Sequence, residues 1–282
     1  MGRNRKKRCL AFLMALTMMT SLFMGDAAGL LVKAEDTAGS VQIAGSTLES
    51  GWYVPATGGG AQYRGVDKVG EEPESGGYIY FDKDTATMTV YNDMEIATSG
   101  PIPVTVTGGS LTISGAGNLA VTGTYSPAFN LSGTDAAVVT KDFTGNFKVT
   151  SNSNVINGGS RFEIDTTGDI TLETMSTGFL ISMSSGVVDL SGKKVTLTAP
   201  MDKIDNGVTT LNLTQTEGDF VLSTAGDPIF LAENVTLKNT GGKVELKNTS
   251  TTALTNGNLT IEAAGDISLK SANGITSSYR DY

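Results

Sequence analysis

The chain has 282 residues, with 20 basic and 29 acidic side chains, a formal net charge of −9, one cysteine and no histidine. The lack of histidine excludes catalytic triads, metal sites and general bases that depend on imidazole. The acidic charge disfavours nucleic acid as a partner, because the phosphate backbone is also negative. With Cys9 as its only cysteine, the chain cannot form an internal disulfide.

The first 34 residues have the organisation of a secretory signal peptide. Basic residues cluster between Arg3 and Arg8, an apolar run extends from Cys9 to Met24, and small residues come next. The run is shorter than the roughly 20 apolar residues of a spanning helix, which favours a cleaved signal over a retained anchor. Val32 and Ala34 suit a cleavage site after residue 34. The remaining chain would carry a net charge of −14 and is expected to be secreted or at the cell surface, without membrane attachment.

Residues 35–87 differ in composition from residues 88–282. They are rich in glycine and acidic residues, and they hold much of the aromatic content, including Trp52 and Tyr53. We interpret them as an N-terminal cap, because the first unit of a repeat domain otherwise exposes apolar side chains and open strand edges. A carbohydrate-binding role for Trp52 and Tyr53, through stacking on sugar rings, is the alternative, and the two roles are compatible.

Residues 88–282 repeat a short apolar-x-apolar triplet every 23 to 26 residues. The triplets begin at Met88, Leu111, Ala137, Phe162, Val188, Leu211, Val235 and Leu259. Apolar residues at every second position are typical of a strand with one buried face. A second triplet occurs in seven units, from Leu119 to Ile267, and a looser apolar position, such as Ile181 or Ile204, closes each unit. A glycine and a polar residue mark the bend between the two triplets.

A unit of about 24 residues with three short strands cannot bury its apolar face alone, so the units must stack. The sequence therefore predicts an all-β fold, a parallel β-helix of about eight coils, with the right-handed crossovers that parallel strands prefer. A β-sandwich also has short strands and frequent turns, but it does not explain the constant period.

The middle residues of the first triplets are predicted to form an outward ladder. It contains Thr89, Thr112, Val138, Glu163, Asp189, Asn212, Thr236 and Thr260. The carboxylates of Glu163 and Asp189 would lie roughly 5 Å apart, one coil spacing. Three interpretations stay open: a calcium site completed by Asn212, a retaining glycosidase pair, or a solvated surface on which Arg161 pairs with Glu163. Calcium is thus the one candidate cofactor. No catalytic residue is assigned, because the chain is poor in the basic residues that an enzyme for acidic polysaccharide would need.

The last coil, from Leu259 to Ile275, ends in the sequence "ITSSYRDY". An uncapped terminal coil offers free strand edges, so we expect end-to-end self-association unless Tyr279 and Tyr282 fold across it.

The segments "GGYIYFDKDTATMTVYNDMEI" and "GGSLTISGAGNLAVTG" resemble the opening coils of secreted or cell-surface parallel β-helix proteins of Gram-positive bacteria, and the resemblance covers roughly residues 41–278. Many of those proteins are described as carbohydrate-binding domain-containing, and relatives bind acidic plant polysaccharide with calcium. The resemblance implies an extracellular binding or structural module for carbohydrate or cell-surface contact. The alternatives are a polysaccharide lyase or glycoside hydrolase on the same scaffold, and a purely structural adhesin stalk.

Overall fold

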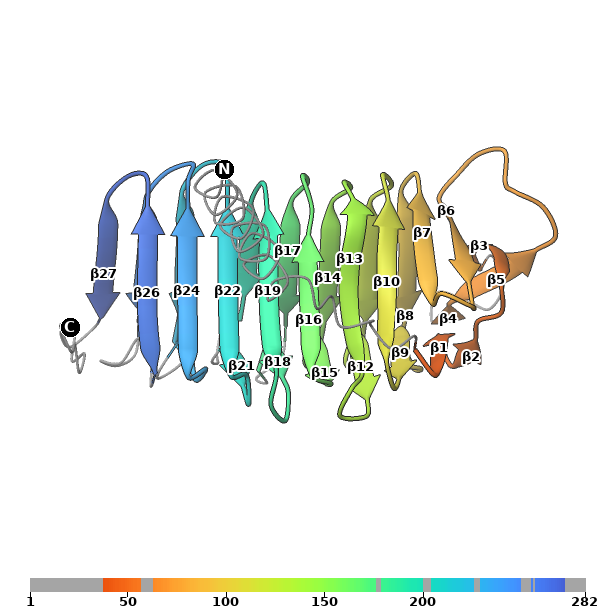
Figure 1. Ribbon diagram of the computed structural model, residues 1–282, viewed down its shortest axis with the longest axis horizontal. Coiled ribbons are helices and arrows are strands. Elements are labelled where there is room, and N and C mark those ends of the chain that lie inside the picture. Colours follow the sequence, from red (N-terminus) through yellow and green to blue (C-terminus); the bar gives the residue numbers. More distant parts are fainter. Residues whose placement is uncertain are drawn as a thin grey trace, which may run out of the picture. The chain divides into compact units, whose positions relative to one another are not determined.

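The computed structural model describes residues 38–56, 63–175, 179–199, 204–225, 229–249, 255 and 257–271 (Figure 1). They belong to one unit, Thr37–Tyr282. The predicted signal peptide lies outside the described residues, as do Tyr279 and Tyr282. Over the described ranges every regular element is a β-strand, and no helix there is long and apolar enough to cross a membrane. The predicted all-β class is confirmed.

The largest sheet, which we name sheet A, contains one strand from each successive coil. Its eight parallel strands in the described chain are β7 (Thr87–Tyr91), β10 (Ser110–Gly115), β13 (Ala137–Phe143), β16 (Arg161–Asp165), β19 (Val187–Gly192), β22 (Thr210–Gln215), β24 (Asn234–Asn239) and β26 (Asn258–Ala263). Each strand pairs with its counterpart one coil later, as Figure 1 shows from yellow to blue. This pairing confirms the right-handed parallel β-helix with coils of about 24 residues.

Two further layers complete each coil. Sheet C contains β4 (Tyr63–Arg64), β8 (Met94–Thr98), β11 (Leu119–Gly123), β14 (Phe147–Ser151), β17 (Ile170–Thr174) and β20 (Val195–Thr198), and sheet D continues with β23 (Phe220–Thr224), β25 (Val244–Asn248) and β27 (Ile267–Ser271). Sheet B contains β2 (Ser46–Thr47), β1 (Ser40–Ile43), β9 (Val104–Thr107), β12 (Phe129–Ser132), β15 (Ile156–Gly158), β18 (Ile181–Ser182) and β21 (Asp205–Asn206).

The core consists of inward side chains stacked in columns. In sheet A the column Leu111, Val138, Phe162, Val188, Leu211 and Val235 is at most 1% exposed. Aromatic rings from all three layers meet in the middle, where the ring centroid of Phe129 lies 5.5 Å from that of Phe162 and 6.1 Å from that of Phe147. Stacking therefore buries an apolar face that a single coil would expose.

The register differs from the prediction in two strands of the outward ladder. Val138 pairs with Leu111 and Phe162 in the inward column and is fully buried, so Val139 takes the ladder position opposite Thr112 and Glu163. Because Ala137, Val138 and Val139 are all apolar, the sequence pattern does not show which of them face the core. Pairing with the neighbouring coils turns Val138 inward. In β7 the pairing is displaced by two residues, so Thr89 lies beside Ser114 and not beside Thr112.

The N-terminal strands close the first coil. β6 (Tyr78–Asp82) pairs antiparallel with β7, and β3 (Gly51–Pro55) and β5 (Val66–Val69) extend the sheet beyond it. Inward side chains of this segment, Leu48, Tyr53, Ile79 and Phe81, are at most 5% exposed. Since β1 and β4 also pair antiparallel with β9 of sheet B and β8 of sheet C, sheets A, B and C each begin with antiparallel strands.

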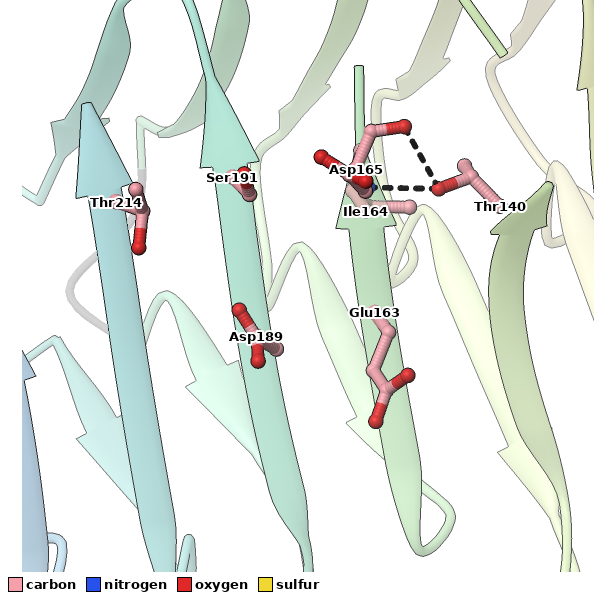
Figure 2. A pocket seen from close by; sticks show the side chains of 7 residues that line it. All are labelled: Thr140, Glu163, Ile164, Asp165, Asp189, Ser191 and Thr214. Carbon is pink, nitrogen blue, oxygen red and sulfur yellow. Dashed lines mark hydrogen bonds between the residues drawn. The ribbon is translucent and has the colours of Figure 1, made fainter. Parts of the chain in front are cut away.

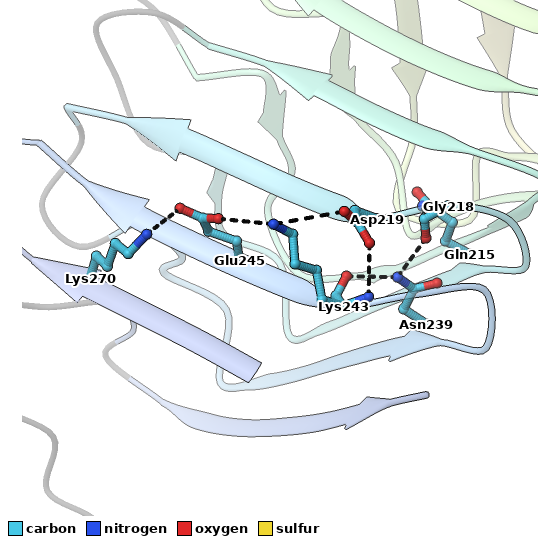
Figure 3. Close-up of polar contacts among 7 residues, drawn as sticks. All are labelled: Gln215, Gly218, Asp219, Asn239, Lys243, Glu245 and Lys270. Atoms are coloured by element: carbon cyan, nitrogen blue, oxygen red, sulfur yellow. Dashed lines mark hydrogen bonds and ion pairs between the residues drawn. The ribbon is translucent and has the colours of Figure 1, made fainter. Parts of the chain in front are cut away.

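Polar side chains tie the last coils together (Figure 3). The buried amides of Gln215 and Asn239 both donate to the carbonyl oxygen of Gly218. On the surface of sheet D, Lys270 lies 2.8 Å from Glu245, and Lys243 lies 3.7 Å from Glu245. The hydrogen bond from Lys270, with its charge and that of Lys243, lowers the pKa of the Glu245 carboxyl. The two side-chain amides thus provide hydrogen bonds to a backbone carbonyl group in a bend between strands, where pairing between strands does not provide them.

One charged residue interrupts the core. Asp205 pairs with Ile181 in the inward column of sheet B. The sequence pattern predicts the neighbouring residue, Ile204, at this position. The carboxyl group of Asp205 is fully buried; Oδ1 accepts the backbone N–H of Leu231 at 3.0 Å, and Oδ2 has no partner among the described residues. Burial raises the pKa of Asp205 to about 6, against two backbone hydrogen bonds that lower it.

Truncation of an inward side chain should destabilise the fold strongly. Ile170→Ala or Leu222→Ala should lower the free energy of unfolding by about 2–5 kcal/mol, because each removes a fully packed residue. Thr171→Ala, in the outward position next to Ile170, should change it by less than about 0.5 kcal/mol. Chemical denaturation measures both values, and equal losses would show that the inward and outward assignment is wrong.

The buried Asp205 should make stability depend on pH in a specific direction. Its pKa is higher in the folded chain, about 6, than the ordinary value of 3.8, so ionisation opposes folding. The penalty is absent below about pH 4, develops as the pH rises, and is complete above pH 6, where it reaches about 3 kcal/mol. Asp205→Asn should therefore gain stability relative to the unmodified chain between pH 4 and 7 in denaturation experiments. Parallel stability curves would contradict the assignment.

Candidate functional site

The outward face of sheet A carries a groove of about 350 Å³ (Figure 2). Its lining side chains come from four neighbouring strands, β13, β16, β19 and β22: Thr140, Glu163, Ile164, Asp165, Asp189, Ser191 and Thr214. Alternation explains why Glu163, Asp165, Asp189, Ser191 and Thr214 face the groove, because residues such as Phe162, Ile164 and Leu190 fill the core while their neighbours project outward. The groove is therefore polar, with three carboxylates and three hydroxyls.

Glu163, Asp189 and Asn212 form one row across three strands, as the sequence predicted. Glu163 pairs with Asp189 in the register of β16 and β19, and Asp189 pairs with Asn212 in that of β19 and β22. Nδ2 of Asn212 donates to Oδ2 of Asp189 at 3.5 Å. Figure 2 shows the carboxyl groups of Glu163 and Asp189 on adjacent strands at about the same height. Parallel pairing thus places two carboxylates side by side.

Arg161 contacts both carboxylate oxygens of Glu163, through one hydrogen bond and one ion-pair contact. Nε and Nη2 of the guanidinium each lie 2.5 Å from one carboxylate oxygen, and the two residues are separated by two positions on the outward face of β16. This fork is the strongest arrangement of an arginine and a carboxylate, and both side chains are about one-third exposed. The predicted ion pair is confirmed, and it uses both oxygens of Glu163.

The groove raises the pKa of Asp189. Burial is the largest cause, because it disfavours the charged form, and the negative charges of Glu163 and Asp165 add to it. The hydrogen bond from Asn212 and the charge of Arg161 act in the opposite direction.

Sequence reasoning misses Asp165 and Thr140 of the groove. Asp165 lies two residues after Glu163, so strand alternation alone could have found it. Thr140 could not be found in this way, because alternation from the inward Val138 places it on the core side of β13; a β-bulge follows it, in which Asp142 has a φ of 53°. Oγ1 of Thr140 accepts the backbone N–H of Asp165 at 2.7 Å and donates to the Asp165 carbonyl at 3.0 Å. Thr140 therefore fixes the strand end that carries Asp165.

The row does not form a ready calcium site. Among the described residues no group of three or more acidic, histidine or cysteine side chains is placed to hold a metal ion. Arg161 is paired with the carboxylate of Glu163, and the amide nitrogen of Asn212 donates a hydrogen bond to Asp189. A calcium ion needs several oxygen ligands, so these side chains would have to rearrange around it. Calcium binding at Glu163, Asp189 and Asn212 stays a prediction.

Trp52 and Tyr53, the predicted carbohydrate contacts, lie on opposite faces of β3. Tyr53 is 5% exposed, and its hydroxyl donates to the Glu49 carbonyl at 2.6 Å, so its ring belongs to the core and closes a turn. Trp52 faces outward and is partly exposed, 4.8 Å from Tyr80 between ring centroids. Of the two, only Trp52 therefore offers aromatic surface on the outward side of sheet A.

Glu163→Gln should lower the pKa of Asp189. The substitution removes a negative neighbour and releases Arg161 to interact more closely with Asp189, so both changes favour the ionised carboxylate. Carbon-detected NMR titration of the side-chain carboxyl measures the shift. An unchanged or higher pKa would show that Glu163 does not act on Asp189 through its charge.

Comparison with known proteins identifies a family for the segment that contains the groove. A family model described as carbohydrate-binding domain-containing protein matches residues 78–278, which include every groove residue but neither Trp52 nor Tyr53. No curated protein and no solved structure matches the chain. The match covers well over half of the sequence. The chain therefore belongs to the carbohydrate-binding domain-containing protein family.

Proposed function

We propose that the chain is an extracellular, non-catalytic carbohydrate-binding module that holds a glycan in the groove of sheet A. The observation that carries this proposal is the groove itself, lined by carboxylates and hydroxyls within the segment that matches the carbohydrate-binding family. The predicted signal peptide supports export, and the resemblance supports a place at the cell surface.

The side chains of the groove suit sugar hydroxyl groups. Carboxylates accept hydrogen bonds from hydroxyls, and the hydroxyls of Ser191 and Thr214 both donate and accept. Because each coil repeats at about 4.8 Å, the outward ladder offers similar polar groups at regular intervals along the solenoid. A regular ladder matches a polymer better than a small ligand, so we propose a polysaccharide partner.

The charge of the groove bears on which polysaccharide binds. Three carboxylates face one arginine, which already pairs with Glu163, so an acidic polymer would be repelled. Acidic plant polysaccharide, the partner implied by the resemblance, therefore requires a bridging cation. Calcium bound between the carboxylates of the groove and those of the polymer would supply that positive charge.

A glycoside hydrolase fits the geometry less well. Adjacent strands place the carboxyl groups of Glu163 and Asp189 near the spacing of a retaining pair, about 5 Å. Both side chains, however, project from the same face of a sheet, so both would contact one side of a bound sugar. The reaction requires the acid and the nucleophile to flank the scissile bond. The geometry thus favours binding over turnover.

A glycan array, probed with and without EDTA, tests the proposal. The unmodified chain should bind a set of polysaccharides and release no product, and loss of binding in EDTA would establish calcium dependence. The double variant Glu163→Gln, Asp189→Asn should lose at least about tenfold in affinity, because it removes two charged acceptors. Sugar release would show an enzyme, and an array without any binding would favour a structural stalk.

The matched control changes the same charge elsewhere. Glu95 on β8 and Glu173 on β17 face outward from sheet C, away from the groove. The double variant Glu95→Gln, Glu173→Gln should bind as the unmodified chain does. Equal losses in both double variants would mean that overall charge, and not the groove, governs binding.

A further inference from the structure

We propose that four aromatic side chains near the N-terminus, Trp52, Tyr78, Tyr80 and Tyr91, form a second contact surface for the glycan that the groove binds, in which Trp52, Tyr80 and Tyr91 contact the sugar and Tyr78 supports them. We name them the aromatic cluster. The inference rests on the proposed function, and it adds a requirement on the ligand, namely pyranose rings that present an apolar face.

The rings of the aromatic cluster pack on the outward side of β3, β6 and β7. The ring centroid of Trp52 lies 4.8 Å from Tyr80, 5.6 Å from Tyr91 and 5.7 Å from Tyr78. Tyr78 and Tyr91 stack at 4.9 Å with an angle of 12° between their planes. Tyr78 is almost buried by these contacts and donates to Glu72, whereas Trp52, Tyr80 and Tyr91 keep part of their surface in solvent.

These rings are not needed to close the core. The inward residues of the same strands, Tyr53, Ile79 and Phe81, already cover the first coil and are at most 5% exposed. Alternation along β6 places Tyr78 and Tyr80 on the opposite face from Ile79 and Phe81. The ring contacts stabilise the N-terminal strands, and the partly exposed rings also leave aromatic surface on the solvent side of the sheet, where it can contact a ligand.

The aromatic cluster and the groove share one continuous face. The strand order of sheet A runs from β3 through β6, β7, β10 and β13 to β16, and Tyr80, Thr89 and Ser114 occupy one outward row between them. Four strand spacings separate β6 from β16, a distance of about 19 Å. A glycan lying along the solenoid axis can therefore reach both, provided that it is several sugars long.

The chemistry of the two regions is complementary. Each face of a pyranose ring carries C–H groups, whose slight positive charge is attracted to the negative face of an aromatic ring. The groove binds hydroxyls by hydrogen bonds, whereas the aromatic cluster covers the apolar face of the sugar. A polymer offers both kinds of surface along its length, and an oligosaccharide too short to span them would lose one of the two contacts.

Tryptophan fluorescence provides a direct test, because Trp52 is the only tryptophan of the chain. The full chain is titrated with cellohexaose, hexaglucosamine and hexagalacturonate, the last with calcium, and with the corresponding disaccharides, while calorimetry measures binding independently. At least one hexasaccharide should bind, change the emission of Trp52, and bind about tenfold more tightly than its disaccharide. Tyr80→Ala keeps Trp52 as the fluorophore. It should lower the affinity for that hexasaccharide by about tenfold and leave the affinity for the disaccharide unchanged.

The outcomes separate the two proposals. If a hexasaccharide binds by calorimetry while Trp52 emission and the affinity of Tyr80→Ala stay unchanged, the aromatic cluster is not a contact and the groove proposal stands. If no sugar binds, both proposals fail. Tyr125→Ala is the control, since Tyr125 is 77% exposed on the turn between β11 and β12, outside sheet A, and it should bind normally. Thermal melting followed by circular dichroism verifies that each variant is folded.

Discussion

In-register parallel pairing of successive coils is the constraint from which both the core and the outward face arise. A strand that pairs with its counterpart one coil later must keep its side chains on the same face, so one residue type accumulates inside and another outside. The inward column from Leu111 to Val235 exists for this reason, and so does the outward row of Glu163, Asp189 and Asn212. Stability and the candidate site therefore have a common origin.

The same constraint sets the electrostatics of the groove. Parallel pairing leaves Glu163 and Asp189 no freedom to separate along the strand, so their repulsion must be balanced locally. Arg161 does this for Glu163 from the same strand, and Asn212 donates to Asp189 from the next. Burial, together with the negative charges of Glu163 and Asp165, still raises the pKa of Asp189. A face built in this way is polar, regular and partly neutralised, which suits repeated hydroxyl groups.

Much of this could be predicted from the sequence, because a period of two within strands and about 24 between them encodes the register directly. The adjacency of Glu163 and Asp189 and the pairing of Arg161 with Glu163 are consequences of it. The orientation of Val138 could not be predicted, since the triplet Ala137–Val139 is apolar at all three positions and fits either parity.

The other differences also have physical causes. Thr140 lines the groove just before a bulge that has no apolar signature, and a buried carboxylate at Asp205 contradicts the apolar pattern that identifies the column. Whether Trp52 faces the core or solvent depends on the antiparallel pairing of β3, which no repeat in the sequence specifies.

A crystal structure of the chain with an oligosaccharide selected by the array would show directly whether the register of sheet A builds a glycan-binding face. We expect sugar over β16 and β19, in hydrogen-bond contact with Asp189 and with Glu163 or Arg161. Sugar bound on the outward face of sheet C or D, with the groove of sheet A empty, would contradict that expectation.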